Sequence, residues 1–199
     1  MGSSHSRLSA NYTDTNPAGA FRWHSWDAET VLYWGNAATS VGDGFYDRTS
    51  ETSTWIGSIV YFYTFLRVNP EWRMLFADLA HEQIFHGALF VDPDYAAAGT
   101  PYDPAFPERN TPATLYYQRA QELWPAVILE YARWGNYWHA PGTITPADWL
   151  VERDRLLDQY FPVRSDVLLA QLRNVQPQLY PTLDAPALSQ YGGPVTSAQ

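Results

Sequence analysis

The sequence contains no cysteine and no lysine, since all twelve of its basic residues are arginine. The absence of cysteine excludes disulfides, zinc–thiolate sites and thiol nucleophiles. The absence of lysine excludes Schiff-base chemistry, and it excludes the phosphate-anchoring lysine of P-loop proteins and protein kinases from this chain. The sequence also lacks an apolar run of the length that a transmembrane helix needs, so no membrane partner is expected.

Apolar and aromatic residues are abundant, at 46% and 16% of 199 residues. This composition favours one folded domain with a sizeable core. The nine tryptophans and fourteen tyrosines indicate a dense aromatic core, with a sugar- or base-stacking surface as the alternative. A net charge of −9 argues against a nucleic-acid partner, because nucleic-acid binding depends on basic residues that neutralise phosphates.

Apolar residues at helical spacing predict a mainly α fold with a small N-terminal β-hairpin. The hairpin is expected to pair residues 8–13 with residues 21–26, and helices are expected over 54–67, buried on most sides, and over 70–85. Asn69-Pro70, Thr111-Pro112 and Thr145-Pro146 each combine an N-cap residue with a proline at the first helical position, which predicts three helix starts. Pro125 is expected to divide or kink the second of these helices, and Pro162 to interrupt the third before a last helix that ends near residue 175.

The chain divides into a polar leader with the start of the hairpin (1–20), a helical domain (21–175) and an extended linker tail (176–199). The apolar face of helix 70–85 is assigned to Trp72, Leu75, Phe76, Leu79 and Phe85. The residues expected to be buried in the core are Trp72, Phe76, Trp134, Trp149, Leu156 and Leu172, because each lies on the apolar stripe of its helix.

Residues 21–29 alternate in a period-2, aromatic-rich pattern that predicts a strand ending at Asp27, with a second acid at Glu29. A carboxylate at the end of a strand is a common ligand of Mg²⁺, and kinases use such an aspartate to hold Mg²⁺ against nucleotide phosphates. The alternative is structural, with Asp27 as the N-cap of a helix that starts at Ala28.

Two other groups of residues suggest metal ligands but have commoner explanations. His81 and His86 resemble the zincin pattern, yet they are five residues apart, about 140° around a helix, where that motif requires two histidines on one face. A surface position for His81 and a capping position for His86 before Gly87 are favoured. The acids of the loop 36–54, such as Asp43 and Asp47, are expected to be solvated.

The run Phe-Arg-Trp-His-Ser-Trp-Asp-Ala-Glu at 21–29 resembles the Mg²⁺-binding segment of the CotH kinase family, the spore-coat-protein-H-like atypical kinases. Further segments resemble this family in the same order along the chain, so that the resemblance covers about residues 21–193. These segments are 69–73, 76–78, 132–135, 148–157, 160–164, 171–173, 179–181, 184–186 and 190–193.

The resemblance implies a protein-kinase-like fold, ATP and Mg²⁺ as cofactors, and serine residues of coat or surface proteins as substrate. It places the metal at Asp27, with Glu29 beside it, and implies a secreted, extracellular or cell-surface protein. In the family, the N-lobe and the catalytic Asp precede this segment, whereas here only 26 residues precede Asp27. The chain therefore corresponds to the C-terminal lobe, with the N-lobe or a larger multidomain parent protein as its partner.

Two hypotheses follow. In the first, the chain is the C-terminal lobe of a CotH-type kinase, which binds Mg²⁺ at most and is inactive alone. In the second, it is a non-catalytic surface or coat module that uses its aromatic residues to bind glycan or protein. Whether the chain is an enzyme is left open by the sequence.

Overall fold

The structure is a computed structural model, and it describes residues 5–9, 22–26, 47, 49–54, 59–97, 100–134 and 145–183. In the N-terminal part, β1 (His5–Ser9) pairs antiparallel with β2 (Arg22–Trp26), and His5 lies opposite Trp26. The second strand agrees with the predicted residues 21–26. The first strand lies closer to the N-terminus than the predicted residues 8–13. The described part of the chain is otherwise mainly helical, as the apolar spacing predicted.

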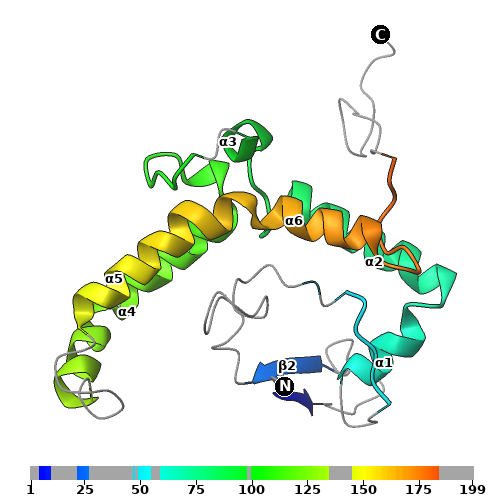
Figure 1. Cartoon of the computed structure of the whole chain (residues 1–199), viewed down its shortest axis with the longest axis horizontal. Helices are drawn as coiled ribbons and strands as arrows, with labels where there is room; N and C mark the ends of the chain where they lie inside the picture. Colours follow the sequence, from blue (N-terminus) through cyan, green and yellow to red (C-terminus); the bar gives the residue numbers. More distant parts are fainter. Residues whose placement is uncertain are drawn as a thin grey trace, which may run out of the picture.

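Residues 146–174 form a nearly continuous helical rod with a bend (Figure 1). Helix α5 (Pro146–Arg155) continues into a single π-helical segment, η3 (Leu156–Tyr160), which leads directly into α6 (Phe161–Asn174). Pro162 was expected to interrupt the helix, but it lies in the first turn of α6. A proline is tolerated at this position although it has no backbone N–H. A π-helical turn followed by a proline is a known cause of helix bending.

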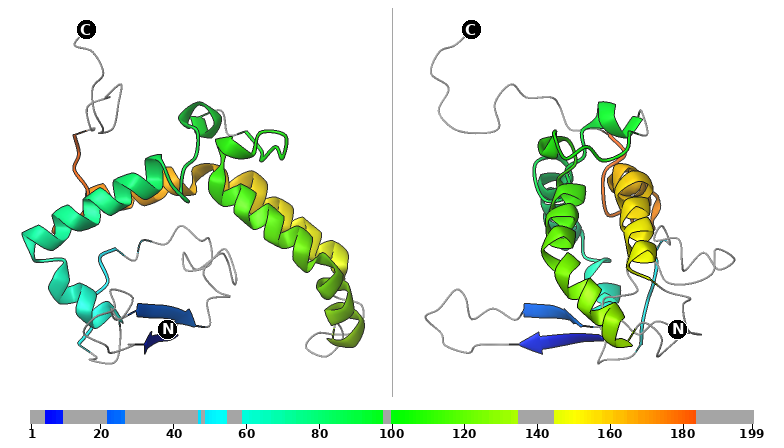
Figure 2. Two further views of the ribbon diagram at one scale, coloured as in Figure 1. Left: turned by 180° about the vertical axis from the view of Figure 1, so that it is seen from behind. Right: turned by 90° about the vertical axis from the view of Figure 1, so that its left-hand side faces the viewer.

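Two other helices lie along this rod, one on each side of the bend (Figures 1 and 2). Helix α4 (Thr111–Trp134) runs beside α5, and α2 (Pro70–Phe85) runs beside α6. Pro125 lies inside α4 without dividing it. The short helix α1 (Ile59–Leu66) precedes α2 at the far end of the arc.

Two predicted helix starts have the expected caps, at Asn69 and Thr145, whereas the side chain of Asn110, one residue before Thr111, accepts from the backbone N–H of Ala113 (3.1 Å) at the start of α4. The side chain of Asn69 accepts hydrogen bonds from the backbone N–H groups of Glu71 (2.8 Å) and Trp72 (3.2 Å) at the start of α2. At the start of α5, the carboxylate of Asp148 accepts from the backbone N–H of Thr145 (2.6 Å) and from its hydroxyl (2.8 Å). Both arrangements satisfy groups that a helix start otherwise leaves unpaired.

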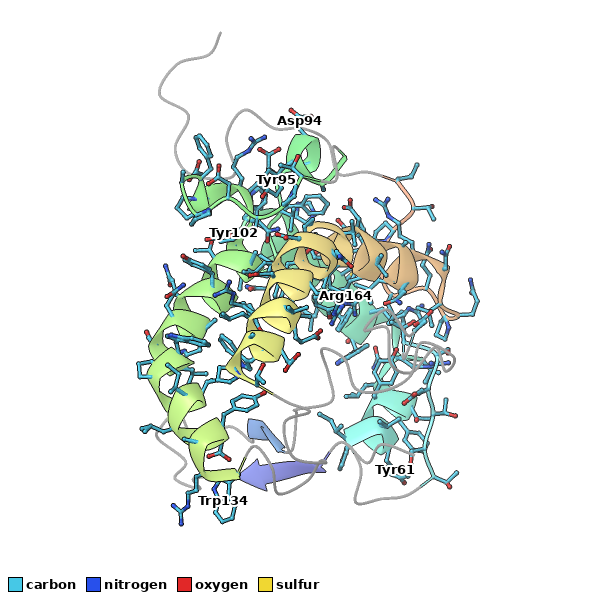
Figure 3. All side chains as sticks on the ribbon, turned by 60° about the vertical axis from the view of Figure 1, so that its left-hand side comes forward. Tyr61, Asp94, Tyr95, Tyr102, Trp134 and Arg164 are labelled. Atoms are coloured by element: carbon cyan, nitrogen blue, oxygen red, sulfur yellow. The ribbon has the colours of Figure 1, made fainter. Side chains whose placement is uncertain are left out.

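The segment between α2 and α4 is held together by local contacts at the top of the bend. It contains α3 (Pro93–Ala97) and the short 3₁₀ helix η2 (Pro107–Arg109). Asp92 and Arg109 form an ion pair (2.9 Å), and the hydroxyl of the buried Tyr95 donates to the carbonyl of Pro101. Figure 3 shows Tyr95 and Tyr102 close together in this region.

Two core clusters lie on opposite sides of the bend. The first joins α2 to α6 and to the segment that follows α6, through Ile84, Leu172, Val175, Leu179 and Tyr180. The second joins α4 to η3 and to the start of α6, through Ala113, Leu156, Leu157, Tyr160 and Phe161. Along α4 and α5 the contact continues through Trp124 and Trp149, whose rings are 5.6 Å apart.

The expected core is confirmed in part. Leu156 and Leu172 are buried, and Trp72, Phe76 and Trp149 are half-buried, but Trp134 is 41% exposed at the end of α4. The assignment of Leu75 and Leu79 to the inner face of α2 is wrong, because the inner face is formed by Trp72, Phe76, Ala77, Ala80 and Ile84. The expectation that the first helix is buried on most sides is also wrong, since Phe62, Phe65 and Leu66 are exposed.

The segment after α6 packs against the helices. Its Leu179 and Tyr180, which sequence analysis placed in the linker tail, are buried, and their N–H groups donate to the carbonyl of Leu172 (3.1 Å each). Arg67 donates to the carbonyl of Gln176 (2.9 Å), and Arg173 donates to that of Pro181 (3.1 Å). Within the described ranges, no helix has both the length and the apolar character that a membrane span requires.

Candidate functional site

The two residues predicted to bind Mg²⁺, Asp27 and Glu29, lie outside the residues that the structure describes. The strand that precedes them, β2, is described as far as Trp26. The metal site and the capping alternative at Asp27 therefore both stay predictions. Of the acids in the loop 36–54, Asp47 is described, and its carboxylate accepts from the backbone N–H (2.8 Å) and the hydroxyl (2.6 Å) of Thr49.

His81 and His86 take part in packing and capping. The Nδ1 atom of His81 is hydrogen-bonded to the hydroxyl of Tyr180 (2.7 Å), so His81 fastens the segment after α6 to α2 and is half-buried there. His86 caps α2, with its backbone N–H bonded to the carbonyl of Glu82 (2.9 Å), as predicted. Among the described residues, no group of three or more His, Asp or Glu side chains is placed to hold a metal ion.

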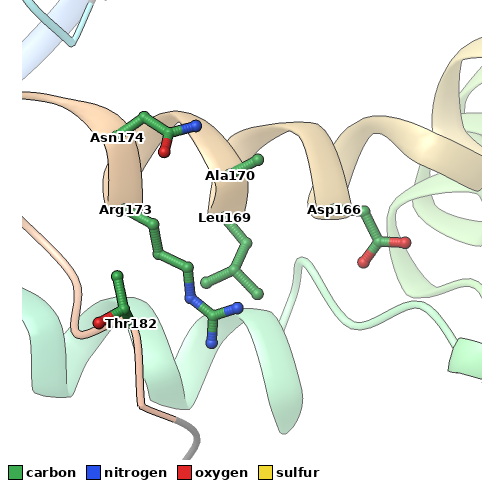
Figure 4. A pocket seen from close by; sticks show the side chains of 6 residues that line it. All are labelled: Asp166, Leu169, Ala170, Arg173, Asn174 and Thr182. Atoms are coloured by element: carbon green, nitrogen blue, oxygen red, sulfur yellow. The ribbon is translucent and has the colours of Figure 1, made fainter.

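An open pocket of about 400 Å³ lies beside the C-terminal half of α6 (Figure 4). Asp166, Leu169, Ala170, Arg173, Asn174 and Thr182 line it. Its one basic side chain, Arg173, already donates to the carbonyl of Pro181 and lies over the ring of Tyr180 at 5.5 Å. The pocket therefore has no cation directed into it that would select an anionic ligand.

A single carboxyl group with a shifted pKa lies at the bend of the rod. Burial raises the pKa of Asp158, the nearby Asp154 raises it further, and the backbone N–H of Tyr102 and the charge of Arg153 partly oppose this shift. A carboxyl group with a raised pKa is suited to general acid–base catalysis when a nucleophile or a second acid lies within reach. Asp154 is close enough to act on this pKa, but among the described residues Asp158 has no side-chain hydrogen bond to a nucleophile or to a second acid, so it does not form a catalytic set there.

The outer face of α2 carries exposed apolar and acidic side chains together. Met74, Leu75 and Leu79 are each more than 60% exposed, as is Val68 just before the helix. The exposed carboxylates Glu71, Asp78 and Glu82 lie on the same side, at spacings of three to four residues from the apolar ones. We refer to these seven residues as the acidic–apolar face.

The outer face of α4 differs in charge. It exposes Leu115, Leu123 and Leu129, together with two arginines and two glutamates, which are Arg119, Glu122, Glu130 and Arg133. Arg119 and Glu122 form an ion pair on this face. Figure 3 shows Trp134 at the end of α4, and the guanidinium of Arg133 lies over its ring at 4.9 Å.

Comparison of the chain with family models, with curated proteins and with solved structures gives no match.

Sequence reasoning missed the acidic–apolar face and the contact between His81 and Tyr180. A signal for the face was present, because helix 70–85 has apolar residues on both sides and only one side can pack on α6. No local signal indicated that Tyr180 would reach His81, since the two residues are 99 positions apart.

Proposed function

We propose that this chain is the helical C-terminal lobe of a CotH-type atypical protein kinase, and that it does not transfer phosphate alone. The proposal rests on the ordered resemblance of residues 21–193 to that family, and the mainly helical fold is compatible with it. A kinase-like arrangement of the helices is part of the proposal.

The observation that carries the proposal is the exposure of large apolar side chains on α1 and α4. Soluble monomers rarely expose extended apolar surfaces, and such surfaces usually contact another protein element. A lobe that is normally covered by a second lobe accounts for this exposure. The side chains concerned are Phe62, Phe65 and Leu66 of α1, and Leu115, Leu123, Ile128 and Leu129 of α4.

The chemistry explains why the lobe is expected to be inactive alone. Phosphoryl transfer depends on positioning and on cations around the phosphates. The chain has no lysine for this task. Asp27, with Glu29 beside it, would hold Mg²⁺ weakly, because Mg²⁺ sites of this kind take further ligands from the phosphates of the nucleotide. The partner lobe would supply the remaining contacts to ATP.

The test measures transfer of labelled phosphate from ATP to a serine-rich peptide with Mg²⁺ or Mn²⁺. The full chain is assayed alone, with an added CotH-type N-lobe, and with that lobe and an Asp27→Ala substitution. We expect transfer only when the lobe is present and Asp27 is intact. Transfer by the chain alone that disappears in Asp27→Ala would make it a minimal kinase. Absence of transfer even with the N-lobe would contradict the kinase proposal.

A second candidate is a non-catalytic surface or coat module that binds glycan or protein through aromatic side chains. Trp134 favours it, because this side chain is 41% exposed with a guanidinium over its ring, whereas Trp72, Trp124 and Trp149 are half-buried. An exposed tryptophan offers a flat apolar surface for stacking. Binding of bacterial surface glycans that Trp134→Ala abolishes, while Trp124→Phe retains it, would support this candidate. Under both candidates, we expect a protein of the cell surface or the extracellular space.

A further inference from the structure

The acidic–apolar face of α2 has a charge pattern that the other helices lack. Glu71, Asp78 and Glu82 are exposed on it, and none of them forms an ion pair with a described residue. The two arginines nearest in the sequence are bonded to backbone carbonyls. Arg73 donates to the backbone carbonyls of Arg67 and Val68, and Arg67 donates to those of Thr49 and Gln176. The negative charge of this face is therefore not neutralised within the described part of the chain.

The apolar residues of the face form a stripe with helical spacing. Leu75 and Leu79 are four residues apart and lie one above the other on the helix surface, next to the three carboxylates, while Met74 lies on the other side of these carboxylates. Val68 is exposed just before the helix. The opposite face of α2 is fully used by the core around Ile84 and Leu172. Leu75 and Leu79 therefore do not contribute to that core, and their exposure calls for another partner.

We propose that the acidic–apolar face docks an amphipathic helix of a partner protein, with basic residues along the side of its apolar stripe that faces Glu71, Asp78 and Glu82. An amphipathic helix recognises such a surface through apolar anchors at spacings of three, four and seven residues. Basic side chains beside these anchors would pair with Glu71, Asp78 and Glu82, which favours fast association and selects against acidic partners. This inference concerns a different surface from Asp27 and does not depend on the kinase proposal.

A second copy of the chain fits this face less well. A symmetric dimer would bring the same three carboxylates of each copy close together, and the chain has a net charge of −9. Like charges that face each other across an interface are unfavourable. Nucleic acid is excluded as the partner because its phosphates carry the same negative charge as the carboxylates of this face. A basic helix is the occupant that satisfies both the charge and the apolar spacing.

The test uses the full chain and a labelled helical peptide of about 18 residues, long enough to span α2, with leucines at helical spacing and flanking arginines. We expect a Kd of roughly 1–100 μM at low salt, measured by fluorescence anisotropy. A peptide of the same composition with its leucine spacing scrambled should bind at least about tenfold more weakly. A peptide with glutamate in place of arginine should show no binding.

Matched protein variants locate the binding site. The pair Leu75→Gln and Leu79→Gln keeps the net charge, and it should raise the Kd at least about tenfold because two apolar anchors are lost. The control pair Leu123→Gln and Leu129→Gln, on the outer face of α4, should change it less than about twofold. The pair Asp78→Asn and Glu82→Gln should weaken binding at low salt and reduce its salt dependence. Circular dichroism verifies that all variants are folded.

Three results would overturn the proposal. The first is equal peptide binding by the chain and by the Leu75→Gln, Leu79→Gln variant. The second is equal binding of the acidic and basic peptides. The third comes from sedimentation of the chain without peptide: a dimer that dissociates in the Leu75→Gln, Leu79→Gln variant would identify a second copy as the occupant.

Discussion

The two halves of the helical rod bury their inner faces in similar ways but differ in what they present outward. On one side of the bend, α6 packs against α2 and the segment 175–180, and on the other, α5 and η3 pack against α4. Both inner faces combine leucines with tyrosines. Outside, α2 exposes carboxylates and apolar side chains, whereas α4 exposes arginines and glutamates between its leucines. The difference indicates that the inner faces serve folding, while the outer face of α2 is suited to a basic partner.

The two halves also differ in how their cores are assembled along the sequence. The α2 half joins Ile84 to Leu172 and Leu179, which are about 90 residues further on. The α4 half joins Ala113 to Leu156 and Leu157, and about half as many residues lie between these core partners. Loop closure costs more entropy for the longer separation, although this cost grows only slowly with length. Both halves share one rod, so we expect them to unfold together.

The largest expected effects concern the two cores. Leu172→Ala in the α2 half and Leu157→Ala in the α4 half should each lower the free energy of unfolding by about 2–5 kcal/mol, because each removes a fully buried leucine. Urea unfolding followed by circular dichroism and by tryptophan fluorescence measures this loss.

The same experiment tests whether the halves are independent. If they unfold as one unit, both probes give the same midpoint in each variant. Two separate transitions in Leu172→Ala would show that the α4 half remains folded without the α2 half. A loss below about 1 kcal/mol in either variant would contradict the assignment of that leucine to a core.

A comparison of two tryptophans gives the next largest effect. Trp72 stacks on Phe76, with ring centroids 5.1 Å apart, and meets the edge of Tyr63 at 6.1 Å. Trp72→Ala should cost roughly 1.5–3 kcal/mol, less than a fully buried aromatic residue. Trp134→Ala should cost at most about 0.5 kcal/mol, because its side chain is exposed. Equal losses in urea unfolding at the two positions would contradict this contrast.

The sequence predicted helix starts far better than it predicted which faces are buried. The starts at Asn69-Pro70 and Thr145-Pro146 were correct because capping depends on a few adjacent residues. The inner face of α2 was misassigned because the apolar arc that begins at Leu75 and Leu79 continues through Trp72 to Ile84 and is wider than the face that packs on α6. Hydrophobic periodicity cannot decide between two apolar faces, since the choice depends on the position of α6.

Tertiary contacts explain the other differences from prediction. Residues after Pro177 have the proline content of a linker, but Leu179 and Tyr180 fill the space between α2 and α6. The π-helical turn at Leu156–Tyr160 has no sequence signature that separates it from an α-helix. The predicted metal ligands Asp27 and Glu29 lie outside the described residues, so for them the sequence remains the source of the prediction.

A smaller effect is expected at the contact that fastens the segment after α6. Tyr180→Phe removes the hydroxyl that is hydrogen-bonded to His81 but keeps the buried ring, and it should cost about 0.5–1.5 kcal/mol. Tyr117→Phe, at a half-buried tyrosine of α4 whose ring contacts that of Tyr102, is a matched control for the substitution itself. Hydrogen exchange of residues 179 and 180 should become faster in Tyr180→Phe. Unchanged exchange and stability would show that the hydroxyl does not hold this segment.

The smallest effect concerns the helix caps, which differ between the halves in their response to acid. The hydroxyl and the backbone N–H of Thr145 lower the pKa of Asp148 in the folded chain, whereas α2 is capped by the uncharged Asn69. Because the folded pKa lies below the unfolded one, Asp148 contributes its full stabilisation above the unfolded value of about 4, and this is lost as the pH falls through the folded value. The free energy of unfolding should therefore be higher for wild type than for Asp148→Asn at pH 7, and this difference should shrink toward pH 2–3. The loss of stability in Asn69→Ala should not depend on pH.

The control concerns Asp92, whose pKa is lowered by Arg109 and which titrates in the same range, so the measurement is repeated in an Asp92→Asn background. If the difference between wild type and Asp148→Asn stays constant from pH 7 to pH 3, the carboxylate of Asp148 does not carry the cap, and both halves depend on uncharged caps alone.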